Sequence, residues 1–146
     1  MNIYFACSIT GGRNDESIYQ TIVDTLVAGG HNVPTAHLSN PDVVNFESVV
    51  EPQEVFTRDI RWIEECDALI AEVSTPSHGV GFEIAYALSI NKPVLCLHHR
   101  DVRISKMITG NTNPNIKVLA YHNQEEIMTI LCHFLDDRTQ IKTKST

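Results

Sequence analysis

The sequence has no long hydrophobic run, no surplus of positive charge and no closely spaced pair of cysteines. None of its apolar stretches approaches the roughly 20 residues that a membrane-spanning helix needs. Its 18 acidic residues outnumber its 11 basic ones, and the resulting net charge of −7 argues against binding to the backbone of DNA or RNA. We therefore expect neither a membrane nor a nucleic-acid polymer as a partner.

Signals for a disulfide framework, a zinc site or export are also missing. The four cysteines, at positions 7, 66, 96 and 132, form no C-x-x-C motif, so we expect reduced thiols rather than disulfides or zinc ligands. His98 and His99 follow a predicted strand without a matching cysteine or carboxylate pattern, which favours turn or surface histidines. The first residues lack the basic start of a signal peptide. The expected location is cytoplasmic, with the nucleus also open if the source is eukaryotic.

Short apolar runs alternate with longer segments of helical periodicity along the 146 residues, a length typical of one domain. We expect one domain over 1–137 and a flexible tail over 138–146. Residues 34–48 are polar and are predicted to form a long loop. The predicted strands are 3–7, 31–33, 67–73, 93–97 and 116–121, and the predicted helices are 15–28, 52–66, 80–91, 104–108 and 124–135.

This alternation predicts a three-layer, Rossmann-like α/β fold with a parallel five-stranded sheet flanked by helices. In such sheets, ligands bind beyond the carboxyl ends of the strands, near the point where the strand order reverses. The segments that follow the strands 3–7 and 67–73 are therefore the first places to look for a site.

Both of those segments are rich in glycine and hydroxyl residues, and each precedes a predicted helix. Residues 8–13 read Ser-Ile-Thr-Gly-Gly-Arg, and residues 74–83 read Ser-Thr-Pro-Ser-His-Gly-Val-Gly-Phe-Glu. The free N–H groups of a helix start favour an anion, so a phosphate or carboxylate is a candidate ligand. Neither segment is a Walker A or a dinucleotide-binding motif. The alternative is that both are simply tight strand-to-helix turns.

Two carboxylates stand out as a candidate catalytic pair. Glu83 is expected in the first turn of its helix, where the helix dipole favours the ionised form that a nucleophile needs. Asp59 lies beside the apolar stripe of the helix 52–66, where aspartate is a poor helix former. Two carboxylates in different environments are the pattern for cleavage of a glycosidic bond. The alternatives are that Glu83 only stabilises its own helix and that Asp59 pairs with Arg58 or Arg61.

Six segments, taken together and in order, resemble the 2′-deoxynucleoside 5′-monophosphate N-hydrolases, a branch of the nucleoside 2-deoxyribosyltransferase superfamily. The resemblance extends from Ile3 to about Leu135. No single segment is diagnostic, whereas their combination is specific. The segments are Ile3–Arg13, Asp59–Trp62, Asp67–Val73, Pro76–Glu83, Asn91–Leu97 and Ser105–Gly110.

The resemblance implies a flavodoxin-like fold, a homodimer and hydrolysis of the N-glycosidic bond of a deoxynucleoside monophosphate, without a metal or organic cofactor. It implies that Glu83 is the nucleophile, that Asp59 works beside it as the acid for the leaving base, and that Tyr4 holds the glutamate. His37 matches a histidine near the edge of the base. The matches around the sugar and phosphate are Ser8, Ile9, Thr10, Gly11, Ser77, Gly79, Gly81, Ser105 and Met107.

Two of these matches carry particular expectations. Ser105 is expected to reach the phosphate site of the neighbouring subunit. Thr10 stands where the family commonly has an arginine, so the charge that would pair with a phosphate is lost. Arg13 is a candidate substitute, and a nucleoside substrate stays open.

Two other functions remain open. The same glutamate and the same intermediate serve a deoxyribosyltransferase, in which a second base replaces water as the acceptor. A catalytically silent nucleotide-binding module is the alternative from another class, against which the joint presence of Tyr4, Asp59 and Glu83 argues.

Overall fold

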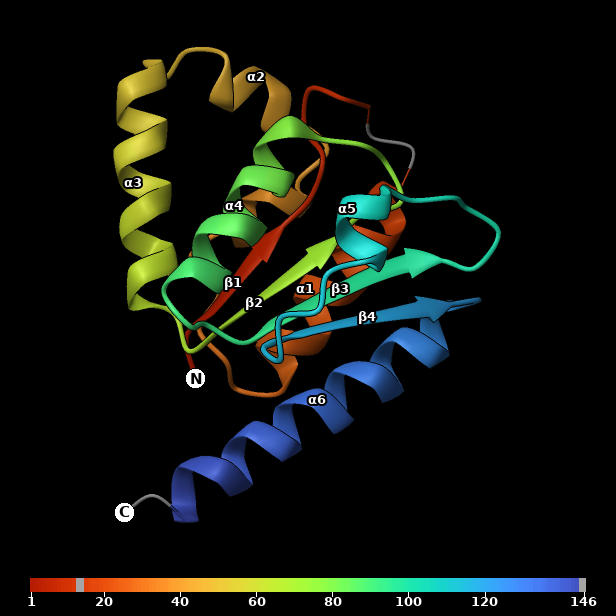
Figure 1. Ribbon diagram of the computed structural model, residues 1–146. Helices are drawn as coiled ribbons and strands as arrows, with labels where there is room; N and C mark the ends of the chain where they lie inside the picture. The colour runs from red at the N-terminus through yellow and green to blue at the C-terminus, as the bar shows by residue number, and fades with distance from the viewer. Residues whose placement is uncertain (13–14, 145–146) are drawn as a thin grey trace.

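The computed structural model describes residues 1–12 and 15–144 and forms an α/β fold around a parallel sheet (Figure 1). The side chains of Phe46 and of residues 141–144 are outside this description. The sheet has four strands in the order β1-β2-β3-β4, all parallel. They are β1 (Ile3–Ala6), β2 (Ala68–Glu72), β3 (Val94–His99) and β4 (Ile116–Tyr121).

The expected fifth strand at 31–33 is not a strand. Asn32 forms only an isolated parallel bridge with Asn2, on the side of β1 that faces away from β2. Two backbone bonds hold it there, from Ile3 N to Asn32 O (2.8 Å) and from Asn32 N to Met1 O (2.9 Å). Pro34 follows almost at once and has no N–H to donate, so the ladder stops. The chain nevertheless has a neighbour on each side of β1, with Asn32 on one side and β2 on the other, so the order of neighbours reverses at β1 as the predicted topology requires.

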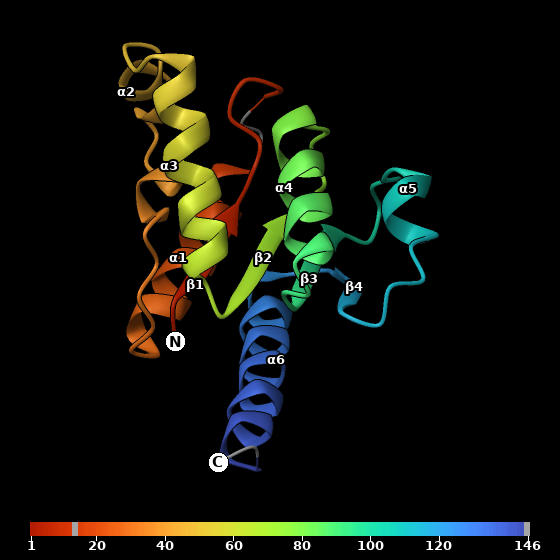
Figure 2. The same ribbon diagram turned by 60° about the vertical axis from the view of Figure 1, so that its left-hand side comes forward.

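Helices cover both faces of the sheet, as predicted (Figures 1 and 2). Helices α1 (Glu16–Ala28) and α6 (Gln124–Lys144) bury one face, with Phe5, Ile70 and Leu97 in their core. Helices α3 (Pro52–Glu65) and α4 (His78–Ser89) bury the other, with Tyr4, Leu69 and Ala71. Since β1 and β2 are covered on both sides, every residue in them is buried. This explains why they are continuous apolar runs rather than alternating ones.

Two segments are more helical than expected. The predicted loop 34–48 contains the 3₁₀ helix η1 (Ala36–Ser39) and the short helix α2 (Val43–Glu47). The last helix continues to Lys144 rather than ending near Leu135, so residues 138–144 are helical where a tail was expected. Local contacts support the extension, because Arg138 packs over the Phe134 ring at 5.3 Å and Thr139 Oγ1 donates to Leu135 O (3.0 Å). The remaining helix is α5 (Lys106–Thr109).

In the part of the chain that the structure describes, no helix is both long and apolar enough to cross a membrane.

Candidate active site

A cavity of about 550 Å³ opens at the carboxyl ends of β1 and β2, between α3 and the start of α4. It is the place that the sheet topology predicts for a ligand. Of the expected site residues, six line it: Ile9, Thr10, Asp59, Ser77, Gly79 and Glu83.

Helix α4 starts at His78, two residues earlier than predicted, because Ser77 caps it. The Ser77 Oγ accepts a hydrogen bond from the Val80 N–H (3.4 Å). Glu83 therefore lies in the second turn and not in the first. The free N–H groups that favour an anion belong to the residues around Gly79, on the floor of the cavity, and not to Glu83.

Tyr4, on β1, positions Glu83 by a hydrogen bond. Its side chain is fully buried on β1, and its hydroxyl donates to Glu83 Oε1 over 2.8 Å. Burial, together with the charges of Glu83 and Asp59, raises the pKa of Tyr4, so the phenol stays protonated and acts only as a donor. The role that the resemblance implied for Tyr4 thus has the required contact.

The environment of Glu83 opposes its ionisation. Burial raises the pKa of Glu83 to about 7, with a further increase from the nearby Asp59 charge, whereas the hydrogen bond from Tyr4 acts in the opposite direction. The carboxyl group is half-buried and faces the cavity. A carboxylate with a pKa near neutrality in a cleft is a functional-site candidate, because such shifts concentrate where acids, bases and nucleophiles work.

Asp59 has the ionic partner that the sequence offered as the alternative. Arg58 Nε donates to Asp59 Oδ1 over 2.8 Å, and Arg58 Nη2 lies 3.2 Å from Glu47 Oε1. The pair does not face bulk solvent, however, because both residues line the cavity. Burial raises the pKa of Asp59, and the hydrogen bond from Arg58 lowers it. The local pairing and a role in the site are therefore compatible.

His37 is set back from the cavity. Its Nε2 lies 2.9 Å from Glu47 Oε1, and its ring meets the Trp62 ring edge-on at 6.2 Å between centroids. It is not among the residues that line the cavity. Through Glu47 it supports Arg58, one contact away from Asp59.

The loop after β1 packs closely against the loop after β2. A Cβ at Gly11 would collide with the carbonyl oxygen of Pro76 and lie 2.9 Å from Ser8 Oγ, so only glycine permits this approach. The Ser8 hydroxyl is fully buried, and among the described residues it has no hydrogen-bond partner. Arg13, the candidate substitute for the missing arginine, is outside the described residues.

Ser105 and Met107 do not reach the cavity that holds Glu83. They line a second cavity, of about 520 Å³, between α4 and α5, which Gly81 also lines and which shares Ser77 with the first. Met107 is 84% exposed. Within one chain, therefore, these two residues are separate from the carboxylates.

Two features of the cavity are not marked in the sequence: Glu47 as a lining residue and the aromatic rim made by Phe56 and Phe82. The two rings are 6.0 Å apart, and each side chain is more than half exposed, at 57% and 51%. No local pattern marks Glu47, because its helix lies inside the segment predicted as a loop. The spacing of Phe56, Ile60 and Ile63 along the sequence predicts that Phe56 belongs to the buried stripe of its helix, and only the placement of α3 at the cavity edge shows otherwise.

The chain is similar to known proteins over most of its length. The family model for nucleoside 2-deoxyribosyltransferase matches residues 3–129. A Methanosarcina mazei protein with the provisional name 2′-deoxynucleoside 5′-phosphate N-hydrolase 1 is 40% identical over 134 residues, covering 92% of this chain and 83% of its own. The 5-hydroxymethyl-dUMP N-hydrolase of Danio rerio is 36% identical over 143 residues, covering 96% and 99%.

A solved structure supports the fold independently. The CMP N-glycosidase BcmB of Clostridium botulinum superimposes with a TM-score of 0.67 at 20% identity, covering 90% of this chain and 98% of that one. At that identity the likeness concerns the fold alone. The family match and the two relatives cover most of the chain, and the protein therefore belongs to the nucleoside 2-deoxyribosyltransferase family.

Proposed function

We propose that the protein hydrolyses the N-glycosidic bond of 2′-deoxynucleoside 5′-monophosphates to a free base and 2-deoxyribose 5-phosphate. The observation that carries the proposal is the carboxylate cluster, which we define as Tyr4, Asp59 and Glu83: two carboxylates on neighbouring helices beside one cavity, one of them held by a buried tyrosine. The names of its relatives point to the same chemistry and the same class of substrate.

In the first step, the ionised Glu83 carboxylate attacks C1′ of the sugar. The C1′–N bond breaks with its electron pair going to the base, through an oxocarbenium-like transition state, and Asp59 in its protonated form gives the base a proton. The product is a glycosyl ester of Glu83. Tyr4 fixes one carboxylate oxygen and so leaves the other directed at the sugar.

In the second step, water attacks C1′ and the ester bond breaks. Asp59, now ionised, accepts a proton from the water, so both carboxyl groups return to their starting states. The raised pKa of Asp59 favours the protonated form that the first step needs. With a pKa of about 7, Glu83 is still partly ionised near neutral pH and so can act as the nucleophile.

Arg58 and Glu47 act as positioning residues in this proposal. Glu47 bonds the Arg58 guanidinium, and Arg58 in turn bonds Asp59, so the side chain of Asp59 has a fixed direction. The same contact limits how far burial can raise the pKa of Asp59. Loss of Glu47 is then expected to disturb the acid without removing it.

The phosphate would be bound mainly by neutral groups. The hydroxyls of Thr10 and Ser77 and the N–H groups at the start of α4 lie on the loop side of the cavity, where the arginine of the family is absent, whereas the buried Ser8 does not line it. Such groups bind anions without a lysine. The phosphate also contributes remote binding energy that positions the sugar.

A homodimer would complete this site. Ser105 and Met107 are exposed on α5 and lie away from their own carboxylate cluster, so they are available to a second subunit. We propose that Ser105 contacts the phosphate of the neighbouring active site. The rim of Phe56 and Phe82 offers a surface on which the base can stack.

Release of free base from a panel of deoxy- and ribonucleoside monophosphates and nucleosides, followed by chromatography, tests the proposal. We expect release from deoxynucleoside monophosphates and a loss of at least about 10³-fold in Glu83→Ala. The matched control is Glu125→Ala, an exposed glutamate on α6. Undiminished turnover by Glu83→Ala contradicts the assignment.

A second arm separates hydrolysis from transfer. One deoxynucleotide is incubated with a different free base, and the products are analysed for an exchanged nucleotide. We expect 2-deoxyribose 5-phosphate and no exchange. Exchange as the main reaction identifies a transferase, whereas a bound but intact ligand identifies a binding module.

A further inference from the structure

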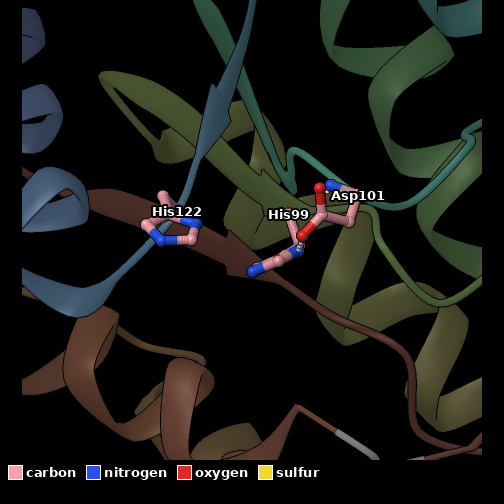
Figure 3. A group of neighbouring side chains, drawn as sticks. All are labelled: His99, Asp101 and His122. Carbon is pink, nitrogen blue, oxygen red and sulfur yellow. Dashed lines mark hydrogen bonds and ion pairs between the residues drawn. The ribbon is translucent and has the colours of Figure 1, made fainter.

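A second group of chemically active side chains lies at the other end of the sheet edge. Among the described residues, His99, Asp101 and His122 each offer a ligand atom, and these three atoms lie within 4.8 Å of one another. In Figure 3, His99 lies between the other two. We call this group the histidine cluster, and none of its members lines the cavity that holds Glu83.

The backbone brings these residues together. His99 ends β3 and pairs in register with Tyr121, the last residue of β4, so His122 follows directly beside it. Just beyond the strands, the Arg100 N–H donates to Tyr121 O over 2.9 Å and keeps the two segments joined. The ring of His99 packs edge-on against the Tyr121 ring, with 5.6 Å between centroids. Two ligands therefore stand on a rigid part of the sheet.

We propose that the histidine cluster binds a divalent transition-metal ion such as Zn²⁺. Two imidazoles and one carboxylate are ligands that Zn²⁺ accepts, and water fills the remaining position of a tetrahedron. In such a site, neighbouring ligand atoms are about 3.4 Å apart, as follows from Zn–N distances of about 2.1 Å. His99 Nδ1 and Asp101 Oδ2 are already 3.7 Å apart.

The state of the imidazole suits a metal ligand. The Asp101 N–H donates to His99 Nδ1 over 3.3 Å, so Nδ1 carries the lone pair that a cation needs. The long distance makes this hydrogen bond weak and easily exchanged for a metal bond. Asp101 and His122 are exposed, so their side chains have room to adjust around an ion, and the three ligand atoms already lie within 4.8 Å of one another.

The charges around the cluster also favour a cation. Arg100 is the basic residue between His99 and Asp101 in the sequence. The Glu126 carboxylate accepts two hydrogen bonds here, one from Arg100 Nη2 (3.3 Å) and one from the His122 N–H (2.8 Å). The positive charge of Arg100 is thus compensated. Glu126 adds a second carboxylate next to the ligands, and the chain as a whole carries a net charge of −7.

Zinc binding to the purified full-length protein tests this inference without any assay of activity. Titration against a competing chromophoric chelator is expected to show one Zn²⁺ per chain at micromolar concentrations. His122→Ala and Asp101→Asn are each expected to weaken binding by more than about tenfold. Because both side chains are exposed, these variants should retain the fold, which circular dichroism verifies.

The matched control is His133→Ala, which removes an exposed histidine on α6 next to the exposed Cys132. It is expected to bind Zn²⁺ like the wild type. In a Co²⁺ titration, the spectrum should show nitrogen and oxygen ligands and no thiolate charge-transfer band. Zn²⁺ should raise the Tm of the wild type but not that of His122→Ala.

Three results overturn the inference. The first is an absence of saturable Zn²⁺ binding below millimolar concentrations. The second is equal binding by the wild type and His122→Ala. The third is loss of binding in His133→Ala together with a thiolate band, which places the metal at Cys132.

Discussion

The carboxylate cluster and the histidine cluster lie at the same edge of one sheet but differ in how their side chains are held. In the first, Tyr4 is fully buried, and both Tyr4 and Asp59 have side-chain partners within 2.8 Å. In the second, His99 Nδ1 and Asp101 Oδ2 are 3.7 Å apart, and the side chain of Asp101 is 75% exposed. Residues 99, 101 and 122 are near solvent, whereas Glu83 and Asp59 line a cavity and are partly buried.

Burial explains what each cluster is suited to do. Burial raises the pKa values of Glu83 and Asp59, because it penalises the charged forms. The pKa of Glu83 reaches about 7, and the shift in the pKa of Asp59 favours the protonated form that an acid needs. The side chains of the histidine cluster, by contrast, are near solvent. Such a cluster is suited to binding a ligand from solution. Substitutions in the carboxylate cluster should therefore lower turnover, whereas substitutions in the histidine cluster should weaken metal binding and leave turnover unchanged.

The largest difference is expected for Asp59→Asn. The amide cannot donate the proton that the leaving base needs, so kcat should fall by about 10²- to 10³-fold. The acid limb of the kcat/KM profile should move to lower pH, because the Asp59 charge that raises the pKa of Glu83 is gone. His122→Ala is the control, for which we expect wild-type turnover. An unchanged acid limb in Asp59→Asn contradicts the coupling of the two carboxylates.

Tyr4→Phe should move the same limb in the opposite direction. The hydrogen bond from Tyr4 lowers the pKa of Glu83, so its loss raises that pKa and shifts the acid limb to higher pH. We expect a decrease in kcat of about tenfold, since one preorganised contact is lost while both carboxylates remain. A pH series on both variants gives the measurement. Shifts in the same direction would show that Tyr4 acts through packing and not through its hydroxyl.

Glu47→Gln should have a smaller effect. The amide still bonds Arg58 but loses its charge, and Arg58 then binds Asp59 less firmly in place. We expect a severalfold decrease in kcat, with the KM for the monophosphate nearly unchanged. Glu54→Gln, which changes an exposed glutamate on α3 outside the cavity that holds Glu83, is the control. Equal losses in the two variants would exclude Glu47 as a positioning residue.

The smallest effect concerns stability, and it is a gain rather than a loss. The pKa of Glu83 is about 7 in the folded protein and near the ordinary 4.5 in the unfolded chain. The folded state therefore binds more protons between these values, and its stability falls as the pH rises through them. Glu83→Gln should be inactive but about 1–2 kcal/mol more stable than the wild type at pH 8. Denaturant unfolding at pH 5 and pH 8 checks this, and an equal difference at both values contradicts it.

The sequence predicted the fold closely where local signals and packing agree. Alternating buried runs and helical periods placed β1, β2, α3 and α4 within about two residues, and their order alone indicated the edge where the site lies. The prediction failed at the ends of elements, where single residues and their short-range contacts decide how far a strand or helix continues. Pro34 shortened the fifth strand to a bridge, and the contacts of Arg138 and Thr139 lengthened the last helix.

For the site, the sequence supplied the chemical identity of the groups and the structure supplied their environment. Glu83 stood out at the predicted start of a helix and Asp59 beside the apolar stripe of the helix 52–66, and Tyr4 was named through resemblance. The pKa of Glu83, the link from Glu47 through Arg58, and the separation of Ser105 from its own cavity all depend on distances between segments far apart in the chain. No spacing along the sequence encodes such distances directly.

His99 illustrates the limit most clearly. By sequence it has a histidine beside it and no metal-binding pattern, whereas in the fold its partners are Asp101 and His122 and not His98. What the sequence determined by itself is the order of apolar and polar segments, because burial of apolar surface follows local periodicity. Which side chains meet at the ends of the strands was decided only by tertiary structure, because parallel pairing aligns residues that the intervening helices keep far apart in the chain.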